Sequence, residues 1–279
     1  MNYFTAKIGC NIVRDPDTED SYTEALYEEE LREYSALGFS HVEFSHVVKL
    51  NIPAAKRLCA LSQKLGIQIW SLHSEHLNDS SREEEYYNIE RHCAEIGKAL
   101  GINVAVCHLP NIENRANDFE RDLRIIRNVL EIFRTHGIRL AIETCEKNDV
   151  DYIIRLIDTI NDPFLGANID TGHVYCNIIH DVGSVIRKFG ERIITLHLQD
   201  NFGENDDHQM PGMGYIDWHD VIAALKEANY CGPLMMEMTG IGVKARRTVE
   251  KLRDYSIEKE RIQGAAYLDW LWKSTAGKK

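Results

Sequence analysis

The chain has 279 residues, of which 44% are apolar and 27% are charged, with 6 prolines and 18 glycines. This is the composition of a globular enzyme, and it excludes a disordered or fibrous chain. The 44 acidic and 32 basic residues give a formal net charge of -12. This charge disfavours negatively charged partners such as nucleic acids and anionic membranes.

The sequence also bears on location and on the state of the thiols. The longest stretch without a charged residue covers 99–112, which is shorter than the about 20 apolar residues of a membrane-spanning helix. The N-terminal segment lacks the pattern of a secretory signal, so we expect a cytoplasmic protein. The 7 cysteines are spread along the chain without a C-x-x-C pair, which indicates reduced thiols and no structural zinc ribbon.

Short apolar runs alternate with longer amphipathic segments along the whole chain. The runs predict eight β-strands, at residues 6–12, 41–45, 67–73, 103–109, 139–144, 164–170, 193–200 and 233–238. Between them, apolar residues recur three and four positions apart, which is typical of helices. The predicted helices cover 24–37, 53–65, 82–100, 119–136, 150–160 and 217–228, with a further helical region from 243 onward.

The alternation of strands and helices predicts the fold class. Strands that are apolar on both faces and separated by helices favour a parallel sheet covered by helices. Eight such units favour closure into a single (β/α)8 barrel, the TIM barrel, over an open doubly wound sheet, which is the lesser alternative. No break in composition marks a domain boundary, so we expect residues 1–279 to form one domain.

Six acidic or histidine side chains fall in the last few residues of successive predicted strands. From strand three to strand eight they are His73, His108, Glu143, Asp170, His197 and Glu237. The carboxyl ends of barrel strands surround one mouth, so these side chains are expected to converge on one pocket. For any one of them, a satisfied polar residue at a strand end is a competing interpretation. Glu143 and Glu237 weigh against it, because an unpaired carboxylate inside an apolar run is costly.

Part of this set has the chemistry of a metal site. Three carboxylates and one imidazole are supplied by Glu143, Asp170, His197 and Glu237. Such an oxygen-rich set favours a divalent ion, Mn²⁺ first, with Mg²⁺, Co²⁺ or Zn²⁺ as alternatives. The cation would also allow neighbouring carboxylates to stay ionised.

Other side chains are candidates for substrate contacts or for a second metal site. The histidine and aspartate candidates are His73, His108, His173, Asp206 and His208. Asp206 and His208 lie in a loop after the seventh strand, and loops at this mouth commonly contact substrate. Trp70, on the third strand, is a candidate for stacking against a sugar, although the alternation of the strand could equally turn it outward.

The polar motifs resemble a known superfamily. In order along the chain they are IETCEKN, NIDTGH, LHLQDN, DDHQMPGMGYIDW and GPLMMEM. Together they resemble the xylose isomerase-like barrel superfamily of sugar isomerases, epimerases and lyases, which also includes endonuclease IV. The resemblance covers essentially the whole chain and does not specify the substrate.

The resemblance to the ketose epimerase branch implies roles for several residues. In that branch, residues matching Glu143, Asp170, His197 and Glu237 hold the metal, and the two glutamates act as acid and base. The histidine three residues after the aspartate is present as His173. Two positions depart from the branch, since Asp149 stands where it usually has a glutamate and His208 where it usually has an arginine. These departures weigh against a simple ketose 3-epimerase.

The chemistry implied by the resemblance is proton abstraction next to a carbonyl. A divalent ion would chelate the carbonyl and an adjacent hydroxyl oxygen of a sugar or keto-sugar and stabilise the enediolate. Glu237 or Glu143 would take the proton, and the other would return one. Return to the opposite face gives epimerisation, return to the neighbouring carbon gives isomerisation, and loss of a β-hydroxyl gives dehydration by a lyase. The sequence leaves all three open. A homo-oligomer is a further expectation from the resemblance.

Endonuclease IV is the strongest alternative within the superfamily. Its trinuclear zinc site uses nine ligands, and their counterparts here are His73, His108, Glu143, Asp170, His173, His197, Asp206, His208 and Glu237. Charge weighs against it, because no Lys or Arg lies between Arg192 and Lys226 and a DNA-binding rim needs cations. A non-catalytic sugar-binding barrel is a third alternative.

Residues 239–247 offer a candidate phosphate site, although a basic first helical turn is the favoured interpretation.

Overall fold

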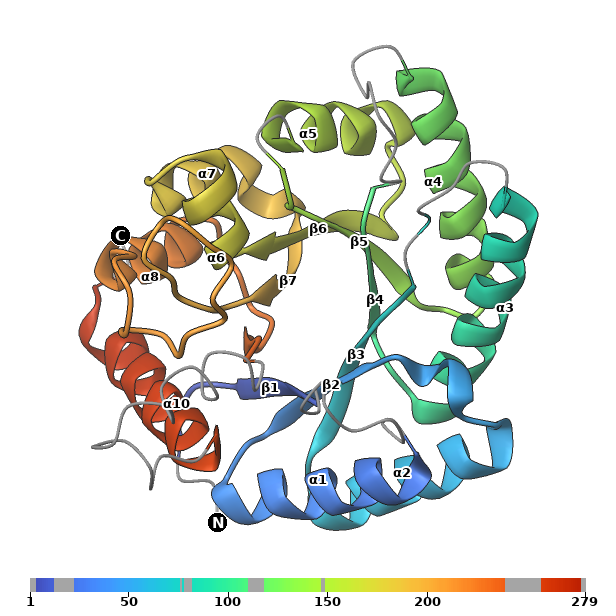
Figure 1. The fold of residues 1–279 in the computed structure, drawn as a ribbon, viewed down its shortest axis with the longest axis horizontal. Coiled ribbons are helices and arrows are strands. Elements are labelled where there is room, and N and C mark those ends of the chain that lie inside the picture. Colours follow the sequence, from blue (N-terminus) through green and yellow to red (C-terminus); the bar gives the residue numbers. More distant parts are fainter. Residues whose placement is uncertain are drawn as a thin grey trace.

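A computed structural model describes residues 4–12, 23–75, 77, 82–109, 118–146, 149–238 and 257–276. In these ranges, parallel strands surround a common centre and helices form a ring outside them (Figure 1). The strands are β1 (Ile8–Ile12), β2 (His41–Ser45), β3 (Gln68–His73), β4 (Val104–Cys107), β5 (Arg139–Glu143), β6 (Leu165–Asp170), β7 (Ile193–His197) and β8 (Leu234–Met236). Each strand lies within one of the predicted runs.

The strands close into a barrel. Their hydrogen-bonded order runs from β7 back through β6, β5, β4, β3 and β2 to β1, and then to β8. All of these pairs are parallel. A bridge between Leu198 and Met236 joins the two edge strands, and the Leu198 amide donates to the Met235 carbonyl oxygen at 2.8 Å. The predicted (β/α)8 barrel is therefore confirmed.

The helices lie between successive strands and cover the outer face of the barrel (Figure 1). They are α1 (Glu24–Leu37), α2 (Ile52–Leu65), α3 (Glu83–Leu100), α4 (Phe119–Arg134), α5 (Asp149–Ile160), α6 (Thr171–His173), α7 (Val182–Phe189), α8 (Trp218–Glu227) and α10 (Ile257–Ser274). Gly66 and Gly101 end α2 and α3 in the left-handed conformation, where glycine is favoured. The helices α6 and α7 lie outside the ranges predicted from the sequence.

Two apolar clusters fill the molecule. The larger lies between the strands and the surrounding helices. The smaller lies inside the barrel and consists of Val104, Val106 and Ala141, with Trp70 and Ile194 packed against it. No helix in the described ranges is long and apolar enough to cross a membrane. Among the buried polar residues, Glu143, Asp170 and His197 are the last residues of β5, β6 and β7.

Candidate metal centre and active site

The carboxyl ends of four neighbouring strands bring the four predicted metal ligands together. Glu143 ends β5, Asp170 ends β6, His197 ends β7, and Glu237 directly follows β8. One donor atom of each lies within 4.8 Å of the donor atoms of the other three. His197 Nδ1 is 3.0 Å from Glu143 Oε1 and 3.1 Å from Glu237 Oε2. These side chains therefore converge on one small volume, as their positions on successive strands predict.

The carboxylates of this cluster are buried in a way that suits a cation. Asp170 Oδ2 and Glu237 Oε2 are buried and make no hydrogen bond within the described residues. Burial raises the pKa of Asp170 well above its usual value; His173 opposes this shift, and the charge of Glu237 adds to it. A divalent ion would compensate this concentration of negative charge. The donor set of three carboxylates and one imidazole fits such an ion.

The two glutamates are held in the ionised form by their neighbours. Burial alone would raise the pKa of Glu143, but the imidazoles of His197 and His108 outweigh it and hold that pKa well below its usual value. Burial would likewise raise the pKa of Glu237, and His197 reverses the shift. Both side chains are therefore ionised at neutral pH, which is the form that a proton acceptor must have.

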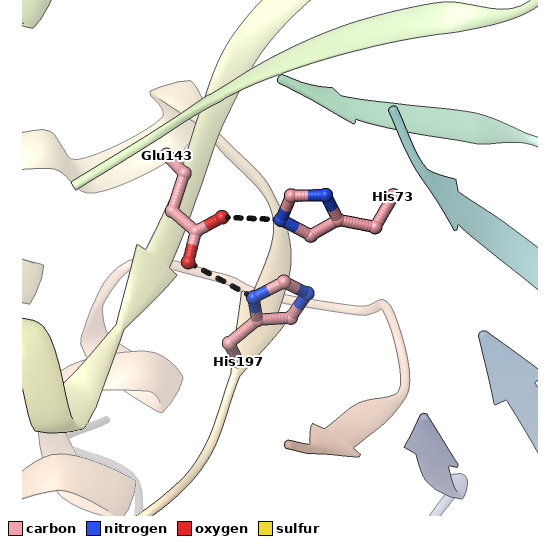
Figure 2. A group of neighbouring side chains, drawn as sticks. All are labelled: His73, Glu143 and His197. Atoms are coloured by element: carbon pink, nitrogen blue, oxygen red, sulfur yellow. Dashed lines mark hydrogen bonds and ion pairs between the residues drawn. The ribbon is translucent and has the colours of Figure 1, made fainter. Parts of the chain in front are cut away.

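A second group of donors shares Glu143 with the first. Glu143 Oε2 is 3.2 Å from His73 Nε2 and 3.0 Å from His108 Nε2. Figure 2 shows the two oxygens of Glu143 facing different histidines, one oxygen toward His73 and the other toward His197. Cys145 borders this group, with its Sγ 3.4 Å from His108 Nδ1. Cys145 was not among the predicted site residues, although it follows Glu143 by two positions.

A third group of donors adjoins the four-residue cluster. Asp206 Oδ2 is 3.1 Å from His173 Nε2 and 2.9 Å from His208 Nε2. The Gln199 amide donates to the other oxygen of Asp206. Asp170 Oδ1 accepts from the His173 amide at 2.7 Å, which joins this group to the first. All three candidates predicted in this part of the chain are therefore brought together.

Asp200 fixes the loop that carries Asp206 and His208. Its carboxylate is fully buried and accepts from the Trp218 indole at 2.8 Å and from the amide of Gly212 at 3.0 Å. These bonds fasten the middle of the loop and the residue that follows it to Asp200, which lies three residues after the end of β7. The loop therefore has a defined path over the mouth of the barrel.

Trp70 is the one predicted site residue that the structure places elsewhere. Its indole donates to Thr195 Oγ1 at 3.2 Å, and it lines a hollow with Arg139, Ile193 and Tyr230. Those residues lie at the amino ends of β5 and β7 and just before β8. The register of β2 and β3 shifts by one residue at Trp70, which turns this side chain into the barrel interior. The expected stacking position is corrected, because Trp70 is at the end of the barrel opposite the site.

Sequence analysis missed Glu43, a buried carboxylate on β2 that belongs to the site. Its Oε1 is 2.9 Å from His197 Nε2, and its Oε2 accepts from Ser71 Oγ at 2.6 Å. The signal was available, because Glu43 interrupts the apolar run HVEFS in the same way that Glu143 interrupts LAIET. The candidate phosphate site at residues 239–247 lies outside the described residues.

Comparisons with known proteins find a matching family model and similar curated sequences. A family model described as xylose isomerase-like TIM barrel matches residues 31–257. An uncharacterized protein of Sinorhizobium fredii is 30% identical over 154 residues, 51% of this chain and 49% of that protein. A D-psicose 3-epimerase of Enterocloster bolteae is 30% identical over 132 residues, 43% of this chain and 42% of the epimerase.

A solved structure is similar over nearly the full length. The D-psicose 3-epimerase of Clostridium cellulolyticum H10, solved with D-tagatose, has a TM-score of 0.77 at 16% identity; the alignment covers 98% of this chain and 100% of that chain. At this identity the likeness shows the fold. The chain spans about half the length of the curated relatives it matches.

Proposed function

The chain belongs to the xylose isomerase-like TIM barrel family, and we propose that it is a divalent-metal-dependent isomerase or epimerase of sugars or sugar derivatives. One barrel domain would carry the whole site. Relatives that are sugar epimerases support the substrate class. The observation that carries the proposal is the convergence of Glu143, Asp170, His197 and Glu237 within 4.8 Å of one another.

Glu143, Asp170, His197 and Glu237 would hold the ion. Mn²⁺ is the first expectation, because the set is rich in carboxylate oxygens. When bound, the ion would supply positive charge that lowers the cost of negative charge on a carbonyl oxygen. Asp170 Oδ2 and Glu237 Oε2 support this placement, because neither makes a hydrogen bond within the described residues. Coordination to an ion would satisfy both oxygens.

The two glutamates would move the proton. Glu143 is 1% exposed and has both oxygens close to histidines, whereas the Glu237 side chain is 13% exposed and its Oε2 contacts His197 Nδ1 at 3.1 Å. We therefore assign the first proton acceptance to Glu237 and the return of a proton to Glu143. Return to the same or a neighbouring carbon distinguishes epimerisation from isomerisation, and loss of a β-hydroxyl would make the enzyme a lyase by the same enolisation.

The surrounding histidines would bind and orient the substrate. His73, His108, His173 and His208 have side chains between 13% and 21% exposed, so they border the open space at the mouth. Imidazoles both donate and accept hydrogen bonds, as sugar hydroxyls do. They would hold the reacting carbon beside the carboxylates and exclude water from one side.

Exchange of substrate hydrogen with solvent tests the proposal. The protein is loaded with Mn²⁺ and incubated in D2O with D-psicose, D-tagatose and related ketoses, and deuterium on carbon is measured by NMR. We expect incorporation with the wild type and a loss of about 10²- to 10⁴-fold in Glu237→Gln. Glu191→Gln, which removes an acid at the opposite end of the barrel, is the matched control and should exchange as the wild type does.

Two outcomes would contradict the proposal. Absence of exchange with every sugar and ion would favour a sugar-binding barrel without catalysis. Exchange in Glu237→Gln at the wild-type rate would show that Glu237 does not accept the proton.

A second candidate function is a trinuclear metal phosphodiesterase of the endonuclease IV type. The observation that favours it is that all nine counterpart residues belong to four groups of possible metal ligands, three of which contain Glu143. The loop over the mouth disfavours it, because residues 193–225 contain no Lys or Arg to meet phosphates. Three zinc ions per chain together with cleavage of abasic-site DNA would establish this alternative.

A further inference from the structure

Glu43 is an acidic residue that lies within the barrel without belonging to the proposed ligand set. It is fully buried on β2. Both of its oxygens are engaged, Oε1 by His197 Nε2 at 2.9 Å and Oε2 by Ser71 Oγ at 2.6 Å. Burying a carboxylate costs free energy unless hydrogen bonds or opposite charges compensate for the lost hydration.

The two ring nitrogens of His197 face different groups. Nε2 lies 2.9 Å from Glu43 Oε1. With a metal ion bound at Nδ1, Nε2 is the nitrogen that carries a hydrogen and donates it to this oxygen. Nδ1 is the atom that faces Glu143 at 3.0 Å and Glu237 at 3.1 Å.

We propose that Glu43 is a positioning residue that holds His197 with Nε2 protonated and Nδ1 directed at the metal. This inference rests on the proposed function, because it assumes that a divalent ion binds at the four-residue cluster. Histidines that bind metals commonly donate their second nitrogen to a carboxylate, which fixes the ring and raises its basicity. Glu43 supplies that carboxylate here.

Ser71 in turn holds Glu43. Glu43 and Ser71 are register partners on β2 and β3, directly after the irregularity at Trp70. The shift in register turns Ser71 toward Glu43, and the hydroxyl donates to the oxygen that His197 does not use. The result is a line of hydrogen bonds from β3 through β2 to β7 that sets the orientation of one proposed ligand.

Metal affinity tests the inference without reference to turnover. Binding of Mn²⁺ and Co²⁺ to metal-free protein is measured by calorimetry for the wild type, Glu43→Gln and Glu43→Leu. We expect about 10-fold weaker binding in Glu43→Gln, whose amide oxygen still accepts a hydrogen bond, and about 100-fold weaker binding in Glu43→Leu. The absorption bands of bound Co²⁺ should change in both variants. Glu90→Gln, which alters another buried carboxyl group on α3, is the matched control and should bind within about 2-fold of the wild type.

A measurement on the wild type covers the case in which the Glu43 variants do not fold. In the Zn²⁺-loaded protein, ¹⁵N NMR should show His197 coordinated through Nδ1 with a hydrogen on Nε2. Coordination through Nε2 would overturn the inference, as would equal affinity and unchanged Co²⁺ bands in folded Glu43→Leu. If the wild type binds no ion, the proposed function fails as well. If it binds tightly and the Glu43 variants match it, only the role of Glu43 fails.

Discussion

Glu90 is a buried carboxylic acid outside the proposed ligand set, and its replacement by glutamine should change how stability depends on pH. The side chain is fully buried on α3. Burial raises its pKa from 4.5 to about 8, because the charged form loses hydration. Glu90 is therefore mostly protonated in the folded protein at neutral pH and ionised in the unfolded chain.

Wild-type stability should fall as the pH rises because of this difference. A group with a higher pKa in the folded state contributes stability that is fully present below its unfolded pKa and is lost as the pH rises through its folded pKa. Each pKa unit corresponds to about 1.4 kcal/mol, so the shift from 4.5 to about 8 gives about 5 kcal/mol. Rearrangement of the protein around the ionised carboxylate lowers this free-energy cost, and we expect a change in stability of about 2 to 4 kcal/mol.

Urea unfolding of metal-free wild type and Glu90→Gln measures the effect. The difference in the free energy of unfolding cancels the titration of all other groups. It should be near zero at about pH 5 and should reach about 2 to 4 kcal/mol in favour of the variant at about pH 8, with unchanged m-values. A difference that does not vary with pH, or a variant that is less stable at the higher pH, would refute the reasoning.

Three further changes test other parts of the structure. Returning Mn²⁺ to EDTA-treated protein at about 100 times its dissociation constant should raise the free energy of unfolding by about 2.7 kcal/mol, and an unchanged melting temperature would count against an ion site. Asp200→Asn should cost about 2 kcal/mol in urea unfolding, because a charged acceptor for the Trp218 indole and loop amides is lost; a wild-type midpoint would contradict this. Gly172→Ala should cost about 1 to 3 kcal/mol, because its Cβ would lie 2.1 Å from Gln199 Cδ; equal melting temperatures would show that Gln199 moves freely.

The fold could be predicted from the local spacing of apolar residues along the sequence. Each predicted apolar run, five to eight residues long, contains a strand of three to six residues, and α1 covers its predicted range. The helix α7 was missed because only eight residues form it and it follows two short helical segments. It is held by contacts that are distant in sequence, since Arg187 pairs with Asp220 at 2.6 Å and with Glu227 at 2.8 Å.

The site was predictable to the extent that strand ends define it. Glu143, Asp170, His197 and Glu237 needed only their places at the ends of successive strands, and the structure brings them together. Glu43 lies in the middle of β2 and reaches His197 across the barrel interior, which no spacing along the chain reveals. The position of Trp70 depends on a shift in register between β2 and β3, and strand alternation alone does not predict such a shift.

The most direct measurement is anomalous diffraction at the manganese edge from crystals of the protein grown with Mn²⁺. We predict one strong peak within coordination distance of Glu143, Asp170, His197 and Glu237, beside His197 Nδ1. Absence of a peak there, or an ion bound elsewhere while Glu143 and Glu237 face separate regions, would contradict the proposed metal centre and the function built on it.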